Sequence, residues 1–204
     1  MSILLIGIGV ISSVLLMYLG ITFIKKADDG HGLPENIEIF YIVITAIAGC
    51  IAITAFYPYF FLSVLFTAYL AIMAYTDFYV MKLYTIFHII VAFIGYITLF
   101  NLSKLSIREF VLGLIFIFFM WLIKAINTGD VELFFASFPY ICLFADVYKI
   151  NKLYFCFIFL TVIMFISVVV NLKDFIKKGK TKAPFAVPTF AGYVVMALLM
   201  VVAK

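Results

Sequence analysis

The stretch of residues 38–76 decides the fold. It reads EIFYIVITAIAGCIAITAFYPYFFLSVLFTAYLAIMAYT and has no charged residue after Glu38. A helix of about 20 apolar residues crosses the hydrocarbon core of a bilayer, so this run is too long for one crossing. Tyr57-Pro58-Tyr59 divides it, because proline ends a helix and tyrosine favours the membrane interface. The stretch therefore predicts two membrane-spanning helices.

The rest of the chain has the same character. Of its 204 residues, 68% are hydrophobic and 12% are charged, against roughly 45–50% and 25% in soluble domains. A soluble fold would lack the charged side chains that normally face water. The composition therefore excludes a soluble enzyme, a nucleic-acid-binding protein and a disordered protein. We expect the lipid bilayer as a partner and no nucleic acid.

Apolar runs separated by polar, proline or glycine residues predict an all-α, polytopic transmembrane helix bundle of about eight spans. No internal repeat or long linker interrupts them, so we expect a single integral membrane domain over residues 1–204. The first run lacks a basic leading region and a cleavage site, and is expected to be a retained helix. The expected spans are 3–24, 38–56, 59–76, 85–102, 109–126, 131–147, 152–171 and 185–203.

Lysine and arginine are unevenly divided between the two sides of such a bundle. Loops one, three, five and seven share one side, and the positive-inside rule places the side with more basic residues in the cytoplasm. Both termini are then expected outside. The cytoplasmic group is Lys25, Lys26, Lys82, Lys124, Lys173, Lys177, Lys178, Lys180 and Lys182; the other is Lys104, Arg108, Lys149, Lys152 and Lys204.

Two of the ten acidic residues stand at span boundaries on the expected cytoplasmic side. Asp77 ends the third span and Asp130 opens the sixth. No acid lies at the middle of a span, which argues against an ion-coupled transporter. Two carboxyls at one depth can share a proton, one activating water and the other polarising a carbonyl, while Gly129 permits close backbone approach. Solvated acids at helix ends are the alternative interpretation.

Three segments around these acids resemble the type IV prepilin peptidases, which are intramembrane aspartic proteases. Gly129-Asp130, followed by Val131 and Leu133, resembles their GxGD motif. Asp77, followed by a polar turn with Lys82 and Leu83, resembles their first catalytic aspartate. The segment PFAVPTFAG at 184–192 is similar to the one that opens their last helix. The order, spacing and expected side of the three segments agree.

The resemblance implies an aspartic-type endopeptidase of the cell membrane that removes the leader peptide of prepilin-like proteins at the cytoplasmic face. It implies Asp77 and Asp130 as catalytic residues, with Gly129, Lys82, Pro184 and Phe185 supporting the site or the substrate. Neither a metal nor another cofactor is implied. Lys82 could instead be only an inside charge. Pro184 and Pro188 could either start a helix or form a re-entrant wall.

The sequence departs from the family pattern at four positions. Asn127 replaces the first glycine of GxGD, Glu132 stands where a lysine is usual, and Tyr84 and Thr85 replace Pro-Asn. The loop between the first two spans is short and has no cysteine. The chain therefore resembles the short peptidase-only members that serve Tad/Flp-type pili or preflagellins, and methyl transfer is not expected. The alternative is a non-catalytic multi-pass protein, either a secretion or pilus assembly component or a small transporter.

Overall fold

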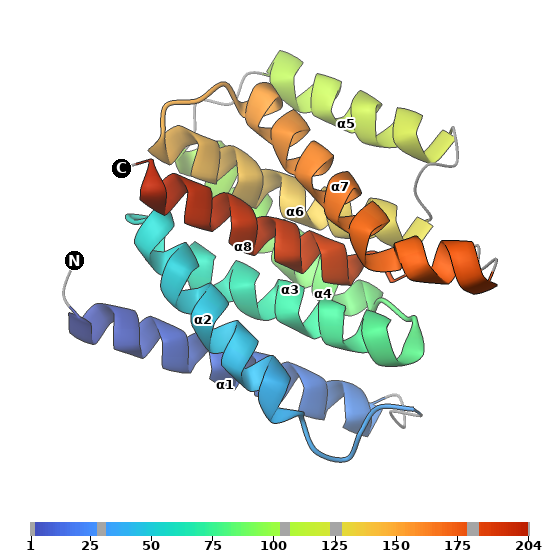
Figure 1. The fold of residues 1–204 in the computed structure, drawn as a ribbon. Coiled ribbons are helices and arrows are strands. Elements are labelled where there is room, and N and C mark those ends of the chain that lie inside the picture. The colour runs from blue at the N-terminus through green and yellow to red at the C-terminus, as the bar shows by residue number, and fades with distance from the viewer. Residues whose placement is uncertain (1–2, 28–31, 103–106, 123–127, 179–183, 204) are drawn as a thin grey trace. The chain divides into compact units, whose positions relative to one another are not determined.

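A computed structural model describes residues 3–27, 32–102, 107–122, 128–178 and 184–203. Within these ranges the chain forms eight α-helices and no strand, which confirms the predicted all-α class (Figure 1). The helices are α1 (Ile3–Ala27), α2 (Ile39–Ala55), α3 (Phe60–Val80), α4 (Thr85–Leu102), α5 (Ile107–Leu122), α6 (Thr128–Val147), α7 (Lys152–Lys178) and α8 (Ala186–Val202).

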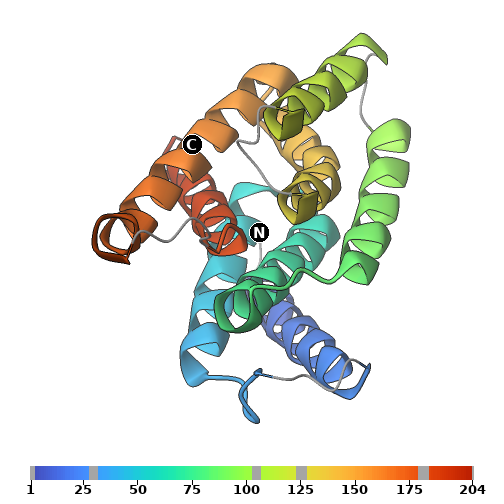
Figure 2. The same ribbon diagram turned by 90° about the vertical axis from the view of Figure 1, so that its right-hand side faces the viewer.

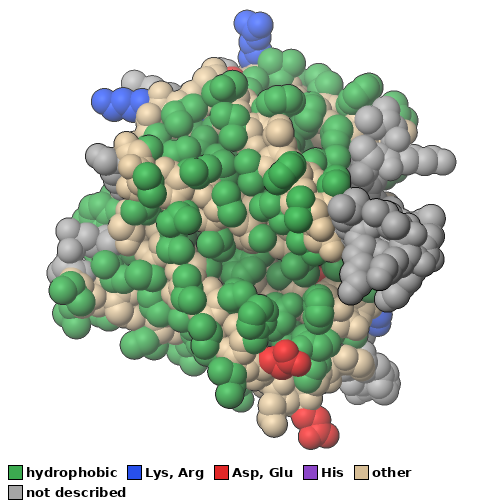
Figure 3. Space-filling model, in the orientation of Figure 1, with side chains coloured by type: hydrophobic (Ala, Val, Ile, Leu, Met, Phe, Trp, Pro, Cys, Tyr) green, Lys and Arg blue, Asp and Glu red, His purple; other side chains and the backbone are tan. Residues whose placement is uncertain are grey.

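Four helices have the length and composition of membrane spans. Helices α1, α3 and α4, and the part of α7 from Lys152 to Val170, are long and apolar enough to cross a bilayer, and α2 and α8 are shorter apolar helices. Large apolar side chains stand on the surface, among them Phe93 at 67% exposure, and they cover most of the face seen in Figure 3. Such a surface suits lipid and not water, so the chain is a helical-bundle membrane protein.

Three helices run further than the apolar pattern predicts. Helix α1 continues to Ala27 instead of ending at residue 24, α3 continues to Val80 instead of 76, and α7 continues to Lys178 instead of 171. A helix follows its backbone hydrogen bonds and does not have to end where side chains become polar. Asp77 therefore lies inside the last turn of α3. Pro188 falls in the first turn of α8, where proline is favoured, so this segment is a helix start.

The chain divides into two compact units, each described here by itself. Unit 1 comprises Met1–Lys82 and Phe159–Lys204. In it α3 packs against α1, α2 and α8, which the two views of Figures 1 and 2 both show. Most residues of α3 are buried. The Thr67 hydroxyl lies 3.3 Å from the Tyr193 hydroxyl, which adds a polar contact between α3 and α8.

Unit 2 comprises Leu83–Ile158, and its centre is the contact between α4 and α6. Gly95 makes this contact close, since a Cβ atom there would lie 2.6 Å from Cγ of Pro139. The Tyr140 hydroxyl donates to the Val91 carbonyl at 2.9 Å. Helix α5 packs on α6 and carries the only tryptophan, Trp121, which is 42% exposed.

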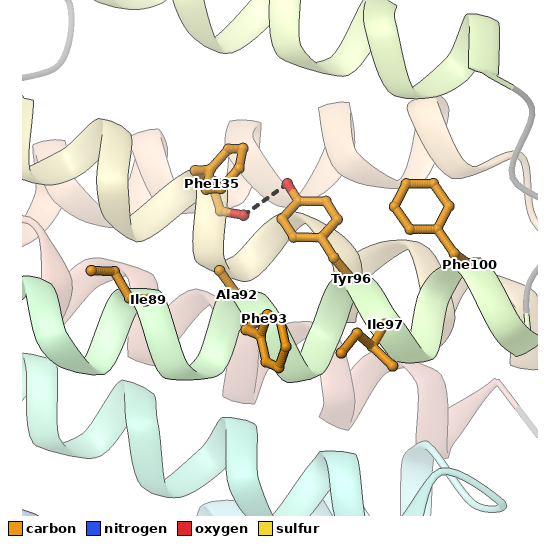
Figure 4. Close-up of a pocket in the computed structure, with 7 residues that line it drawn as sticks. All are labelled: Ile89, Ala92, Phe93, Tyr96, Ile97, Phe100 and Phe135. Carbon is orange, nitrogen blue, oxygen red and sulfur yellow. Dashed lines mark hydrogen bonds between the residues drawn. The ribbon is translucent and has the colours of Figure 1, made fainter.

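Pro139 leaves a gap in the hydrogen bonding of α6 that α4 fills. A proline has no N–H, so the carbonyl four residues earlier, that of Phe135, loses its helical donor. The Tyr96 hydroxyl of α4 donates to this carbonyl at 3.1 Å (Figure 4). The bond gives this backbone oxygen a donor inside the bilayer, where no water can hydrogen-bond to it. Beside it lies an apolar groove of about 460 Å³, lined by Ile89, Ala92, Phe93, Tyr96, Ile97, Phe100 and Phe135.

Candidate functional site

Asp77 lies at the end of α3 in unit 1. Its side chain is buried, with 7% of its surface exposed. Its backbone carbonyl accepts the N–H of Met81 at 3.1 Å, which closes the last turn of the helix. Met81 has a left-handed backbone with φ of 54°, so the chain turns sharply here without a glycine. The turn leads directly to Lys82, which is exposed.

The start of α8 is hydrogen-bonded to the Asp77 carboxyl. Oδ2 of Asp77 accepts the backbone N–H of Ala186 at 2.7 Å, in a buried position. Ala186 is the first residue of α8, and Phe185 before it offers no side-chain cap. The first N–H groups of a helix have no partner within the helix, so α3 supplies the cap that the sequence of α8 lacks. Pro184 and Phe185 therefore lie beside Asp77.

Aromatic side chains surround this end of α3. Tyr75 and Tyr79 occupy successive turns with ring centroids 4.8 Å apart, and the ring of Tyr41 from α2 lies 5.1 Å from that of Tyr75. The side chain of Glu38 forms a hydrogen bond with Tyr79. This tyrosine cluster (Tyr41, Tyr75 and Tyr79) was not predicted from the sequence, although the four-residue spacing of two of its members places them on one face of a helix. The cluster packs the start of α2 against the last two turns of α3.

Asp130 lies in unit 2, in the first turn of α6. It is also buried, with 7% of its surface exposed. Gly129 precedes it and neighbours Leu83, but a Cβ atom at Gly129 would stand 3.4 Å from the nearest Leu83 atom. This is an ordinary contact, so the packing within unit 2 does not demand a glycine. Asn127 lies outside the described residues.

Two of the four departures from the family pattern are hydrogen-bonded to each other. The Thr85 hydroxyl, at the start of α4, donates to Oε2 of Glu132 in α6 at 2.9 Å. Because Glu132 follows Asp130 by two residues, the bond ties the turn that carries Asp130 to the start of α4. One turn further along α4, His88 is buried. The sequence analysis weighed Thr85 and Glu132 separately, and no spacing rule would have paired them.

The structure thus assembles two groups of the expected site residues, one in each unit. In unit 1 it joins Asp77 to the segment that contains Pro184 and Phe185. In unit 2 it places Gly129 and Asp130 beside the start of α4. Both aspartates are buried oxygen acids, which can take up or release a proton and accept hydrogen bonds. Among the described residues, no three His, Cys, Asp or Glu side chains gather as a metal site would require.

Comparisons with protein-family models, with curated proteins and with solved structures find no match to this chain.

Proposed function

We propose that the chain is a membrane-embedded aspartic endopeptidase that removes the leader peptide of prepilin-like proteins at the cytoplasmic face of the cell membrane. One observation carries the proposal: the bond from the Ala186 N–H to Oδ2 of Asp77. It joins two of the three segments that resemble the peptidase family, although they are 109 residues apart in the sequence. If the similarity of these two short segments to the family were accidental, there would be no reason to expect them in contact in the structure.

The chemistry requires both aspartates. One carboxylate takes a proton from a water molecule, and the water oxygen attacks the carbonyl carbon of the scissile peptide bond. The other carboxyl, protonated, donates a hydrogen bond to the carbonyl oxygen. When the tetrahedral intermediate collapses, the carbon–nitrogen bond breaks, and the leaving nitrogen receives the proton that the first carboxylate took from water. The reaction consumes one water, and its products are the leader and the mature subunit.

The surroundings of the two acids support these roles. The Ala186 N–H holds one oxygen of Asp77 in a fixed direction, which orients the carboxyl for reaction. Each aspartate is 7% exposed, and low access of water strengthens the electrostatic interactions of a carboxyl. Gly129 gives a substrate backbone room to approach Asp130, since its missing side chain serves no contact inside unit 2. Lys82 is exposed where it can meet a substrate.

The test is co-expression with a candidate prepilin, followed by electrophoresis to detect loss of a leader-sized fragment. Asp77→Asn and Asp130→Asn should each abolish cleavage while the protein still inserts, because a pair that acts as a unit fails when either member is lost. Glu35→Gln is the matched control, since it removes an exposed acid in the loop before α2. This control should cleave at the normal rate.

Near-normal processing by either aspartate variant would contradict the aspartic-protease proposal. Mass spectrometry of the mature N-terminus adds a second readout from the same samples. The product should be trimmed but carry no methyl group that depends on this chain, because the loop between α1 and α2 is short and has no cysteine. A methyl group that is present only with this protein would show that the short loop suffices.

A further inference from the structure

An open pocket lies at the end of unit 2 opposite to Asp130. Its volume is about 490 Å³, and it is lined by Arg108, Glu109 and Leu112 of α5 and by Asn151 and Leu153 at the start of α7. This volume is within the usual range for small-molecule sites, roughly 300–1,000 Å³. The pocket has no part in the proposed proteolysis.

The pocket lies beside the start of a candidate membrane span. Helix α6 has 20 residues, so its two ends are about 30 Å apart, which is the thickness of the hydrocarbon core. Asp130 is in its first turn, and Asp146 near its last residue pairs with Lys152 of α7 at 2.8 Å. Lys152 also begins a candidate membrane span. The residues that line the pocket therefore flank the boundary where this span enters the bilayer.

The charges of the pocket are one positive and one negative. Arg108 is exposed, and no ion pair of its side chain is found within the described ranges. Glu109 follows it in the chain and lines the same pocket. The nearby Lys152 is neutralised by Asp146. The lining is thus neutral overall. Its two charged residues are consecutive in the sequence, and two leucines line the same pocket.

We propose that this pocket binds the headgroup of phosphatidylethanolamine. The Arg108 guanidinium binds the phosphate, for which its planar set of donors is suited. The Glu109 carboxylate accepts a hydrogen bond from the primary ammonium. Leu112 and Leu153 contact the glycerol and the first methylenes of the acyl chains. One cation and one anion in the same pocket match a zwitterionic headgroup, which carries both charges.

Two other common headgroups fit this arrangement less well. Phosphatidylcholine is also zwitterionic, but its quaternary ammonium has no N–H to donate to Glu109. Phosphatidylglycerol has the phosphate without an ammonium, so Glu109 would meet only neutral hydroxyl groups and no positive charge. The comparison of these three lipids therefore separates the role of Arg108 from that of Glu109.

Native mass spectrometry of the detergent-solubilised full chain, supplied with each lipid at equal concentration, is the test. The intact protein should retain phosphatidylethanolamine about tenfold more than either other lipid, the effect of one charge-assisted hydrogen bond. Arg108→Gln should reduce retention of phosphatidylethanolamine and phosphatidylcholine alike. Glu109→Gln should lower phosphatidylethanolamine to the level of phosphatidylcholine. Lys26→Gln and Glu35→Gln, at exposed residues near the α1–α2 loop, should change nothing.

Three results would overturn the proposal. Equal retention of phosphatidylglycerol and phosphatidylethanolamine would indicate a simple anion site. Equal retention of phosphatidylcholine and phosphatidylethanolamine would remove the role of Glu109. Unchanged lipid retention in Arg108→Gln would place the lipid elsewhere. The first two comparisons use the unmodified protein, so they decide the question even if a variant does not fold, which size-exclusion chromatography would show.

Discussion

At the level of single residues, the contribution of the Asp77 carboxyl to stability can be measured separately from its proposed role in catalysis. Its Oδ2 accepts the Ala186 N–H, and an asparagine in its place keeps an oxygen that can accept the same bond. An alanine has no such oxygen and leaves a buried N–H without a partner. Asp77→Ala should therefore be less stable than Asp77→Asn by about 1–3 kcal/mol, whereas both should be inactive.

Thermal unfolding in detergent micelles measures this difference, with Glu35→Ala and Glu35→Gln as the matched pair at an exposed position. The two Glu35 variants should have the same midpoint. Equal midpoints for the two Asp77 variants would mean that the contact with α8 contributes nothing to stability. The proposed catalytic role would then stand or fall on the cleavage assay alone.

At the level of helices, Tyr96 and Pro139 should behave as a coupled pair. Tyr96→Phe removes the donor to the Phe135 carbonyl and should cost about 1–3 kcal/mol, the usual penalty for a polar group left without a partner away from water. Pro139→Ala restores a backbone N–H that can bond the same carbonyl within α6. In the Pro139→Ala background, Tyr96→Phe should therefore cost much less, and a double-mutant cycle measures the coupling.

Tyr154→Phe is the control for this cycle, because Tyr154 is 62% exposed at the start of α7. It should cost little in either background. If Tyr96→Phe cost the same with and without Pro139, the Tyr96 hydroxyl would not be replacing the missing helical bond. The α4–α6 contact would then depend on packing at Gly95 and on the bonds made by Tyr140 and Thr85.

The helices could largely be predicted from the sequence, while their contacts could not. Apolar runs and Tyr57-Pro58-Tyr59 give nearly every boundary, because lipid requires long apolar helices and proline interrupts them. The ends of α1, α3 and α7 were misplaced, since helical hydrogen bonds continue into polar sequence. The Asp77–Ala186 bond joins segments that no local pattern relates. Pro139 did leave a signal, since its missing N–H requires a donor from another helix.

At the level of the whole molecule, the proposed peptidase requires Asp77 of unit 1 and Asp130 of unit 2 to act on one water molecule. In a variant without the native cysteines, Asp77→Cys and Asp130→Cys should be joined by a short bifunctional thiol reagent. The control is Asp77→Cys with Asp146→Cys, because residue 146 lies about 24 Å from residue 130 along α6. Cross-linking of the control pair alone would contradict a shared site.

The same variant background tests the orientation in the membrane. Val80→Cys and Thr128→Cys should react with a membrane-impermeant thiol reagent from the cytoplasmic side, as the unequal distribution of lysine and arginine predicts. Two native cysteines, Cys142 and Cys156, are buried, whereas Cys50 is exposed, so at least Cys50 must be replaced. Labelling from the outside only would invert the topology, and the proposed cytoplasmic cleavage would be wrong.

The fluorescence of Trp121 can report how deep the end of α5 lies in the bilayer. Because this residue is the only tryptophan and is 42% exposed in the last turn of α5, the indole fluorescence reports the surroundings of one helix end. Bromine atoms attached to lipid chains quench such fluorescence on contact. Indole rings favour the interface, so bromines near the headgroup should quench more strongly than bromines near the bilayer centre. The immersion of α5 can therefore be followed in vesicles without attaching any dye.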